Sequence, residues 1–237
     1  MADNGREGQE TQNVVSAHQT LRDAIITSKL APGTVSSQVA LAREFDIGRT
    51  PLREALRLLQ SEGLVAGDPN RRVRIVDIDA EDLEDLYVLR VLLETTALKL
   101  TLPGMTSADI AEIRGFMAQM DHYGNDDDWS GLRGPHKAFH MKFVADGGPR
   151  VVKLIDGLFD QGERYRQAFI AVTADEWAER QTEHQGLIDA AVDRDAQRGA
   201  ELLARHYVRS AELVISNLEP GRPLDRLDSI VATITST

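Results

Sequence analysis

The segment between Ser36 and Val76 constrains the fold of this chain more than any other part. Two stretches in which apolar residues recur with helical spacing are joined by a tight turn at Gly48. Pro51 suits the first position of the second helix, where its missing N–H costs nothing, and Thr50 is a suitable capping residue. Two short extended runs around a turn follow, as in a β-hairpin. The pattern predicts a helix-turn-helix followed by a small β-hairpin wing.

The rest of the chain shows helical patterns only. From residue 80 to residue 218 apolar side chains recur with helical spacing. This predicts an antiparallel all-α bundle, so the fold class of the whole chain is mainly α. The predicted divisions are a disordered polar segment (1–12), a winged helix-turn-helix (13–76), the helical bundle (80–218) and a Ser/Thr-rich, mobile tail (219–237).

The charge of the chain is unevenly distributed. The total of −11 would by itself argue against a nucleic-acid partner. Residues 13–76, however, carry nine basic and six acidic side chains, a net charge of +3, whereas residues 77–237 have a net charge of −12. A mildly basic module joined to a strongly acidic one predicts two domains with different partners.

Composition excludes several classes of protein. The chain has no cysteine, which rules out disulfides and thiolate metal sites. No apolar run approaches the roughly 20 residues of a membrane span. The N-terminal residues lack the basic and apolar regions of a signal peptide. We therefore expect a soluble, cytoplasmic protein.

Basic residues gather on the predicted recognition helix and wing. The planar fork of arginine can pair with guanine or clamp a phosphate, and a threonine hydroxyl beside a helix N-terminus can bind a phosphate oxygen. The predicted DNA-contacting residues are Arg49, Thr50, Arg53, Arg57, Arg71, Arg72 and Arg74. The alternative is that the arginines pair with Glu54 and Glu62 on a solvated helix.

Four histidines lie on apolar helix faces. His136 and His140 are one turn apart on the same helix, a spacing that lets two imidazoles meet one ion. His184 and His206 each share a face with leucines on two later helices. A single histidine in such a place is usually a core residue, but three helices that each point one inward predict a metal site.

Arg90 lies on the apolar stripe of the first bundle helix, between Leu86 and Leu93. A charge carried into the bundle needs a partner. Glu94, four residues on, is one candidate. A bound carboxylate ligand is the other, and the spacing does not decide between them.

The string GRTPLREALRLLQSEGLV, with LAREFDIGRT before it, resembles the signature of the GntR superfamily of bacterial transcription regulators. Two departures stand out. Gly48 replaces the more usual serine at the turn, and Arg72 stands where the family's wing normally has glycine. Because glycine permits positive φ and close approach to DNA, the wing tip here is expected to be built differently.

The segments LYVLRVLLETTALKL, HKAFHMKFVADGG, TEHQGLIDAAVDRD and LLARHYVRSA resemble the FadR-like branch of that superfamily, whose FCD domain is a helical effector-binding bundle. Metal-binding FCD domains typically use one aspartate and three histidines. The three histidines correspond to His140, His184 and His206, and His136 stands at the aspartate position. His136 either completes an all-nitrogen set, which favours Zn, Ni, Co or Cu over Mg, Ca or Mn, or supports the ligands from outside. Zinc and nickel are the favoured cofactors.

The resemblance implies a ligand-responsive transcription regulator, usually a repressor, that binds a palindromic operator as a homodimer. It also implies a small carboxylate effector that bridges the metal and Arg90. One alternative is a metalloenzyme with an appended DNA-binding domain, although no carboxylate base is evident, since Glu183 is expected to point away from the site. Another is a regulator that binds its ligand without metal.

Overall fold

The computed structural model describes residues 3–67, 72–126, 128–169 and 174–236. It divides into two compact units, one made of the chain up to Asp79 with residues 163–168, and the other of residues 80–162 and 169–237. Each unit is described by itself.

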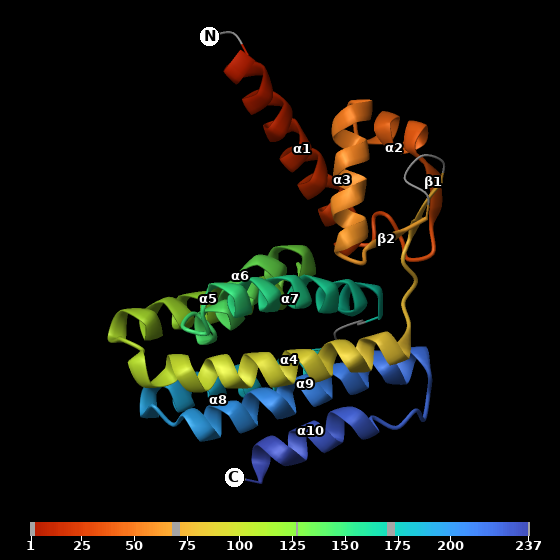
Figure 1. The fold of residues 1–237 in the computed structure, drawn as a ribbon. Coiled ribbons are helices and arrows are strands. Elements are labelled where there is room, and N and C mark those ends of the chain that lie inside the picture. Colours follow the sequence, from red (N-terminus) through yellow and green to blue (C-terminus); the bar gives the residue numbers. More distant parts are fainter. Residues whose placement is uncertain (1–2, 68–71, 127, 170–173, 237) are drawn as a thin grey trace. The chain divides into compact units, whose positions relative to one another are not determined.

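The first unit is a winged helix-turn-helix, as predicted (Figure 1). Its elements are α1 (Asp3–Ile26), β1 (Val35–Ser37), α2 (Gln38–Glu44), α3 (Arg49–Ser61), β2 (Val65–Ala66) and β3 (Arg72–Ile75). The strands form an antiparallel sheet in the order β1-β3-β2. The hairpin of β2 and β3 was predicted, whereas β1 was not, because a run of three residues is too short to show strand alternation.

The spacing of apolar residues on α3 decides which of its faces is exposed. Leu52, Leu56 and Leu59 recur at helical spacing and are buried in a core shared with α1 and β3. Arg53 and Arg57 fall on the opposite face and are exposed. The recognition helix therefore turns its basic face outward because its leucines face inward.

Two details of this unit differ from expectation. The first helix extends back to Asp3, through the segment predicted to be disordered. The residue preceding α3 is Gly48, which offers no side-chain cap, so the prediction that Thr50 caps this helix is wrong. Ser37, by contrast, caps α2 by accepting a hydrogen bond from the backbone N–H of Ala40.

The second unit is the predicted helical bundle. Its helices are α4 (Ala80–Thr101), a short 3₁₀ turn (Leu102–Gly104), α5 (Ser107–Asn125), α6 (Trp129–Phe143), α7 (Pro149–Phe169), α8 (Ala174–Asp193), α9 (Ala196–Leu218) and α10 (Asp225–Thr235). Residues 163–168, in the last part of α7, are counted with the first unit. Helix α4 packs along α9, α9 packs on α8, and α5 packs on both α6 and α8. Within the described ranges, no helix is both long and apolar enough to cross a membrane.

Polar contacts fix the start of one helix of the bundle and the position of another. Helix α6 begins at Trp129, ahead of Pro135, because the Asp128 side chain caps it by accepting the Gly131 N–H at 3.0 Å. The segment predicted to be a mobile tail contains α10, which lies along α4 and α9 (Figure 1). Leu227 of α10 is fully buried, and Glu84 of α4 accepts the backbone N–H of Arg226 at 3.0 Å. These contacts hold the tail as a helix.

Candidate metal centre and nucleic-acid surface

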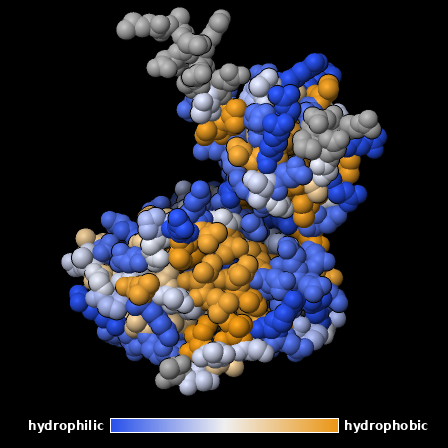
Figure 2. All heavy atoms as spheres, viewed as in Figure 1, coloured by the Kyte–Doolittle hydropathy of each residue, from blue (hydrophilic) through white to orange (hydrophobic). Residues whose placement is uncertain are grey.

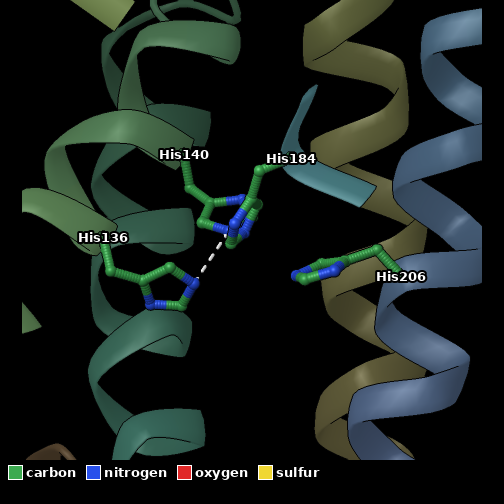
Figure 3. A group of neighbouring side chains, drawn as sticks. All are labelled: His136, His140, His184 and His206. Carbon is green, nitrogen blue, oxygen red and sulfur yellow. Dashed lines mark hydrogen bonds between the residues drawn. The ribbon is translucent and has the colours of Figure 1, made fainter. Parts of the chain in front are cut away.

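The four predicted histidines meet in the interior of the bundle. His136 and His140 come from α6, His184 from α8 and His206 from α9 (Figure 3). One potential ligand atom from each lies within 4.8 Å of the others, and the four side chains are between 1% and 8% exposed. The Nε2 atoms of His136 and His140 are 3.1 Å apart. The structure thus brings together residues that are up to 70 positions apart in sequence.

Burial favours the neutral form of His140 and His206. It lowers the pKa of His206 to about 3, with the charges of Arg180 and Arg90 adding to the effect. It also lowers the pKa of His140 well below its ordinary value, with a further contribution from the neighbouring histidines. A neutral imidazole has one nitrogen with a free lone pair, which is the form that binds metals. A buried cluster of four imidazoles, with one potential ligand atom from each, fits a divalent transition metal.

Glu183 contacts the cluster from outside, contrary to expectation. Its Oε2 lies 2.7 Å from Nδ1 of His206, and burial raises its pKa to about 7 against the opposing charge of Arg180. Successive side chains on an α-helix point about 100° apart. His184 can therefore face the other histidines while Glu183, the preceding residue, reaches α9. Its position next to His184 on the helix had predicted that Glu183 points away from the site.

Arg90 is buried and pairs within the bundle. Its Nε donates to Glu94 at 2.8 Å, and its guanidinium also donates to the Tyr207 hydroxyl at 2.9 Å. The Tyr207 hydroxyl in turn donates to Glu94 and lies 3.4 Å from Nδ1 of His140. Glu94, one of the two partners that the spacing left open, therefore pairs with Arg90. Tyr207 was missed, although its position directly after His206 was visible in the sequence.

The basic side chains of α3 form an exposed surface. Arg49, Thr50 and Arg53 line a hollow of about 340 Å³ beside the start of α2. Arg57 and Arg53 both contact Glu54, at 3.0 and 3.4 Å. Exposed ion pairs of this kind contribute about 0–1 kcal/mol, so they leave the arginines available to a phosphate or a base.

Glu62, the second acidic residue that could have paired with the arginines of α3, instead contacts α1. Glu62 pairs with Arg22 at 3.0 Å and with His18 at 2.6 Å. Its role is therefore to hold α1 against the end of α3. Of the two acidic residues, only Glu54 pairs with arginines of α3.

The wing carries the remaining predicted contacts. Arg72 and Arg74 occupy the exposed positions of β3, where they pair in register with Ser37 and Val35 of β1. Arg74 also forms an exposed ion pair with Asp77 at 2.9 Å. Arg71 lies outside the described residues.

Comparison with known proteins gives a consistent assignment for both units. Residues 14–75 match the family model described as bacterial regulatory proteins, gntR family, and residues 85–209 match the FCD domain. The HTH-type transcriptional repressor GlaR of Escherichia coli (strain K12) is 24% identical over 211 residues, covering 84% of this chain and 94% of that protein.

Two further similarities are a sequence match to part of the chain and a match of the fold. The Nta operon transcriptional regulator of Aminobacter aminovorans is 38% identical over 93 residues, which cover 39% of this chain and 44% of that protein. The solved structure of E. coli McbR/YncC superposes with a TM-score of 0.77 at 19% identity, covering 87% of this chain and 99% of that one. At this identity the superposition speaks for the fold alone.

Proposed function

Because the chain belongs to the gntR family of bacterial regulatory proteins and carries an FCD domain, we propose that it is a metal-dependent transcription repressor. In this proposal a homodimer binds operator DNA through its winged helices, and a small carboxylate bound at the metal changes operator affinity. The observation that carries it is the buried cluster of His136, His140, His184 and His206. The proteins compared above that have a named function are transcriptional regulators, so the alternative of a metalloenzyme finds no support.

The donor set supports zinc or nickel as the metal. All four candidate ligands are imidazole nitrogens, which suit these ions better than magnesium or calcium. His136 is proposed as the fourth ligand because it is buried and its Nε2 lies 3.1 Å from that of His140. The metal would supply a positive charge and a Lewis-acidic centre in the interior of the bundle.

The charge balance of this site supports an anionic effector. Four neutral imidazoles leave the two positive charges of a bound ion uncompensated, and a buried charge is costly without a partner. Of the nearby carboxyl groups, Glu94 is already matched by Arg90, and Glu183, which contacts His206 and Arg209, could supply at most one negative charge. A small carboxylate would supply the missing negative charge, and Arg90 could reach it only in competition with Glu94.

An exposed apolar face supports the homodimer. Figure 2 shows apolar side chains gathered on one face of the helical unit, in the part of the view occupied by α4 and α7. Leu89 and Leu92 on α4 and Leu154 on α7 are between 42% and 58% exposed. Contiguous apolar surface of this kind marks an interaction site. A second copy of this chain is the occupant that a palindromic operator requires.

The test is operator binding measured by fluorescence anisotropy with DNA from upstream of the chain's own gene. We expect specific binding that weakens steeply with salt, and an affinity that differs between zinc-loaded and chelator-treated protein. A panel of small carboxylates should contain compounds that weaken binding of the zinc-loaded form only, since an effector acts through its different affinity for two states. Carboxylate effects that persist without metal would instead support a metal-free regulator.

A further inference from the structure

We infer that two carboxylates, the partly buried Glu183 and the fully buried Glu94, fix the ring tautomers of His206 and His140 so that both rings present Nε2 to the centre of the cluster. The inference concerns these two tautomers in the protein itself, and its consequence for metal affinity rests on the proposed function. Glu183 acts directly, whereas Glu94 acts through Tyr207.

The contact at His206 sets the first tautomer. A neutral imidazole carries its proton on one nitrogen and a lone pair on the other, and a carboxylate can only accept. Since Oε2 of Glu183 lies 2.7 Å from Nδ1 of His206, that nitrogen carries the proton. The guanidinium of Arg209 donates to the other oxygen of this carboxyl group, Oε1, at 3.4 Å, so Oε2 is the oxygen that faces His206. The lone pair is then on Nε2, and the ring extends from α9 toward the other three histidines (Figure 3).

A longer chain of contacts sets the second tautomer. The Tyr207 hydroxyl donates a hydrogen bond to Glu94 and accepts one from Arg90 at 2.9 Å. Its oxygen is therefore an acceptor toward Nδ1 of His140 at 3.4 Å. His140 then carries its proton on Nδ1, and its Nε2 is the atom that lies 3.1 Å from His136. All four residues of this chain of contacts are at most 5% exposed.

The two arrangements have the same chemical logic. Each places a hydrogen-bond acceptor behind the ring, Glu183 for His206 and the Tyr207 hydroxyl for His140, and a lone pair in front of it. Such a partner orients a metal-binding histidine and raises its basicity. Arg90 gains a role here that does not require an effector, because it holds both Glu94 and the Tyr207 oxygen in place. Glu183, Glu94 and Tyr207 are thus positioning residues, and Arg90 supports two of them.

The first arm of the test needs no metal. Long-range ¹H–¹⁵N NMR of histidine-labelled, chelator-treated protein at about pH 8 reports the protonated nitrogen of each ring. We expect the Nδ1–H form for His206 and His140. Glu183→Gln should lower the population of the Nδ1–H form at His206 alone, because an amide can donate as well as accept and so no longer selects one tautomer. Tyr207→Phe should change that of His140.

The matched control is Glu179→Gln. Glu179 lies one turn before Glu183 on α8, contacts the same Arg209 and is exposed, so it shares the surroundings without the contact to His206. Circular dichroism and thermal melting confirm that each variant is folded. An Nε2–H form of His206 in the unmodified protein, or no change in Glu183→Gln, would overturn the inference.

The second arm measures zinc affinity by competition with a chromophoric chelator. Removing a residue that hydrogen-bonds to a metal-binding histidine lowers metal affinity by roughly 10–100-fold. We expect this loss for Glu183→Gln and Tyr207→Phe but not for Glu179→Gln. If the tautomers are as expected but the unmodified protein does not bind zinc, the proposed metal function fails while the tautomer assignment stands. If zinc binds equally to all variants, the positioning role is wrong.

Discussion

Arg90 and Glu94, one turn apart on α4, form an ion pair of 2.8 Å in which the two residues are 5% and 0% exposed. Both charged groups are shielded from water, so each is stabilised by the other and by its hydrogen bond with Tyr207. This pair explains why a charged residue can lie on an apolar stripe without any ligand. It also yields the first prediction.

We expect Arg90→Met to destabilise the metal-free protein by about 3–5 kcal/mol, because the Glu94 carboxylate would be left buried without its cation. Urea unfolding measures this directly. The double variant Arg90→Met with Glu94→Met should recover much of the loss, since neither charge is then stranded. Arg114→Ala, at an exposed arginine of α5, is the control and should change little. A loss below 1 kcal/mol for Arg90→Met would contradict the interdependence of the pair.

A second prediction concerns the basic face of α3. Replacing Arg49 or Arg53 by alanine should weaken operator binding by about 1–3 kcal/mol if the residue reads a base. If it contacts a phosphate, the slope of log affinity against log salt should fall by roughly one. Arg205→Ala, an exposed arginine in the helical unit, should leave both quantities unchanged. Unaltered binding after both α3 substitutions would remove this helix from the DNA interface.

A third prediction separates the two roles considered for His136. If His136 is a ligand, His136→Ala should lower zinc affinity about as much as His140→Ala, and should abolish much of the zinc-induced rise in melting temperature. The reason is that binding to the folded state alone stabilises it by about 2.7 kcal/mol at 100 times Kd. His122→Ala, at an exposed histidine of α5, is the control. A loss for His140→Ala with none for His136→Ala would assign the ion to three histidines.

A fourth prediction tests the apolar face of α4 and α7. Leu92→Glu or Leu154→Glu should convert a dimer to a monomer in light scattering coupled to size exclusion, because a charge would be buried in an apolar contact. Val192→Glu introduces the same change at a 50% exposed valine of α8 and should leave the mass unaltered. If the unmodified chain is monomeric, or if both leucine variants stay dimeric, this face is not the interface.

A fifth prediction concerns the N-terminal cap of α5, in which the side chains of Thr106 and Asp109 each bond to the other residue's backbone N–H. Hydrogen bonds from Thr106, together with Lys142, lower the pKa of Asp109 from its ordinary value of 3.8 to about 2. A carboxyl whose pKa is lowered by folding adds stability above its ordinary pKa and loses it as the pH falls through the folded value. Asp109→Asn should therefore melt below the unmodified protein at neutral pH. The gap should close between about pH 4 and pH 2, and a gap that is independent of pH would contradict the role assigned to the charge.

The sequence by itself determined the features that depend on local spacing. Leucines at helical intervals fixed the buried face of α3, and this placed Arg53 and Arg57 outward whatever the rest of the chain did. In the same way His136 and His140 had to share one face of α6. Residues a few positions apart on a helix have a relative direction set by its pitch, which is why these predictions needed no tertiary information.

Only the tertiary structure decided which segments meet and by which atoms. The contact of Glu183 with His206 spans 23 positions and that of Arg90 with Tyr207 spans 117. Such contacts depend on how each helix is rotated about its own axis when it packs. The spacing of residues placed Arg90 on the apolar face of α4, but it did not decide whether Glu94 or a bound ligand is the partner of Arg90. The packing of α9 against α4 supplied Tyr207, and with it the link from that ion pair to His140.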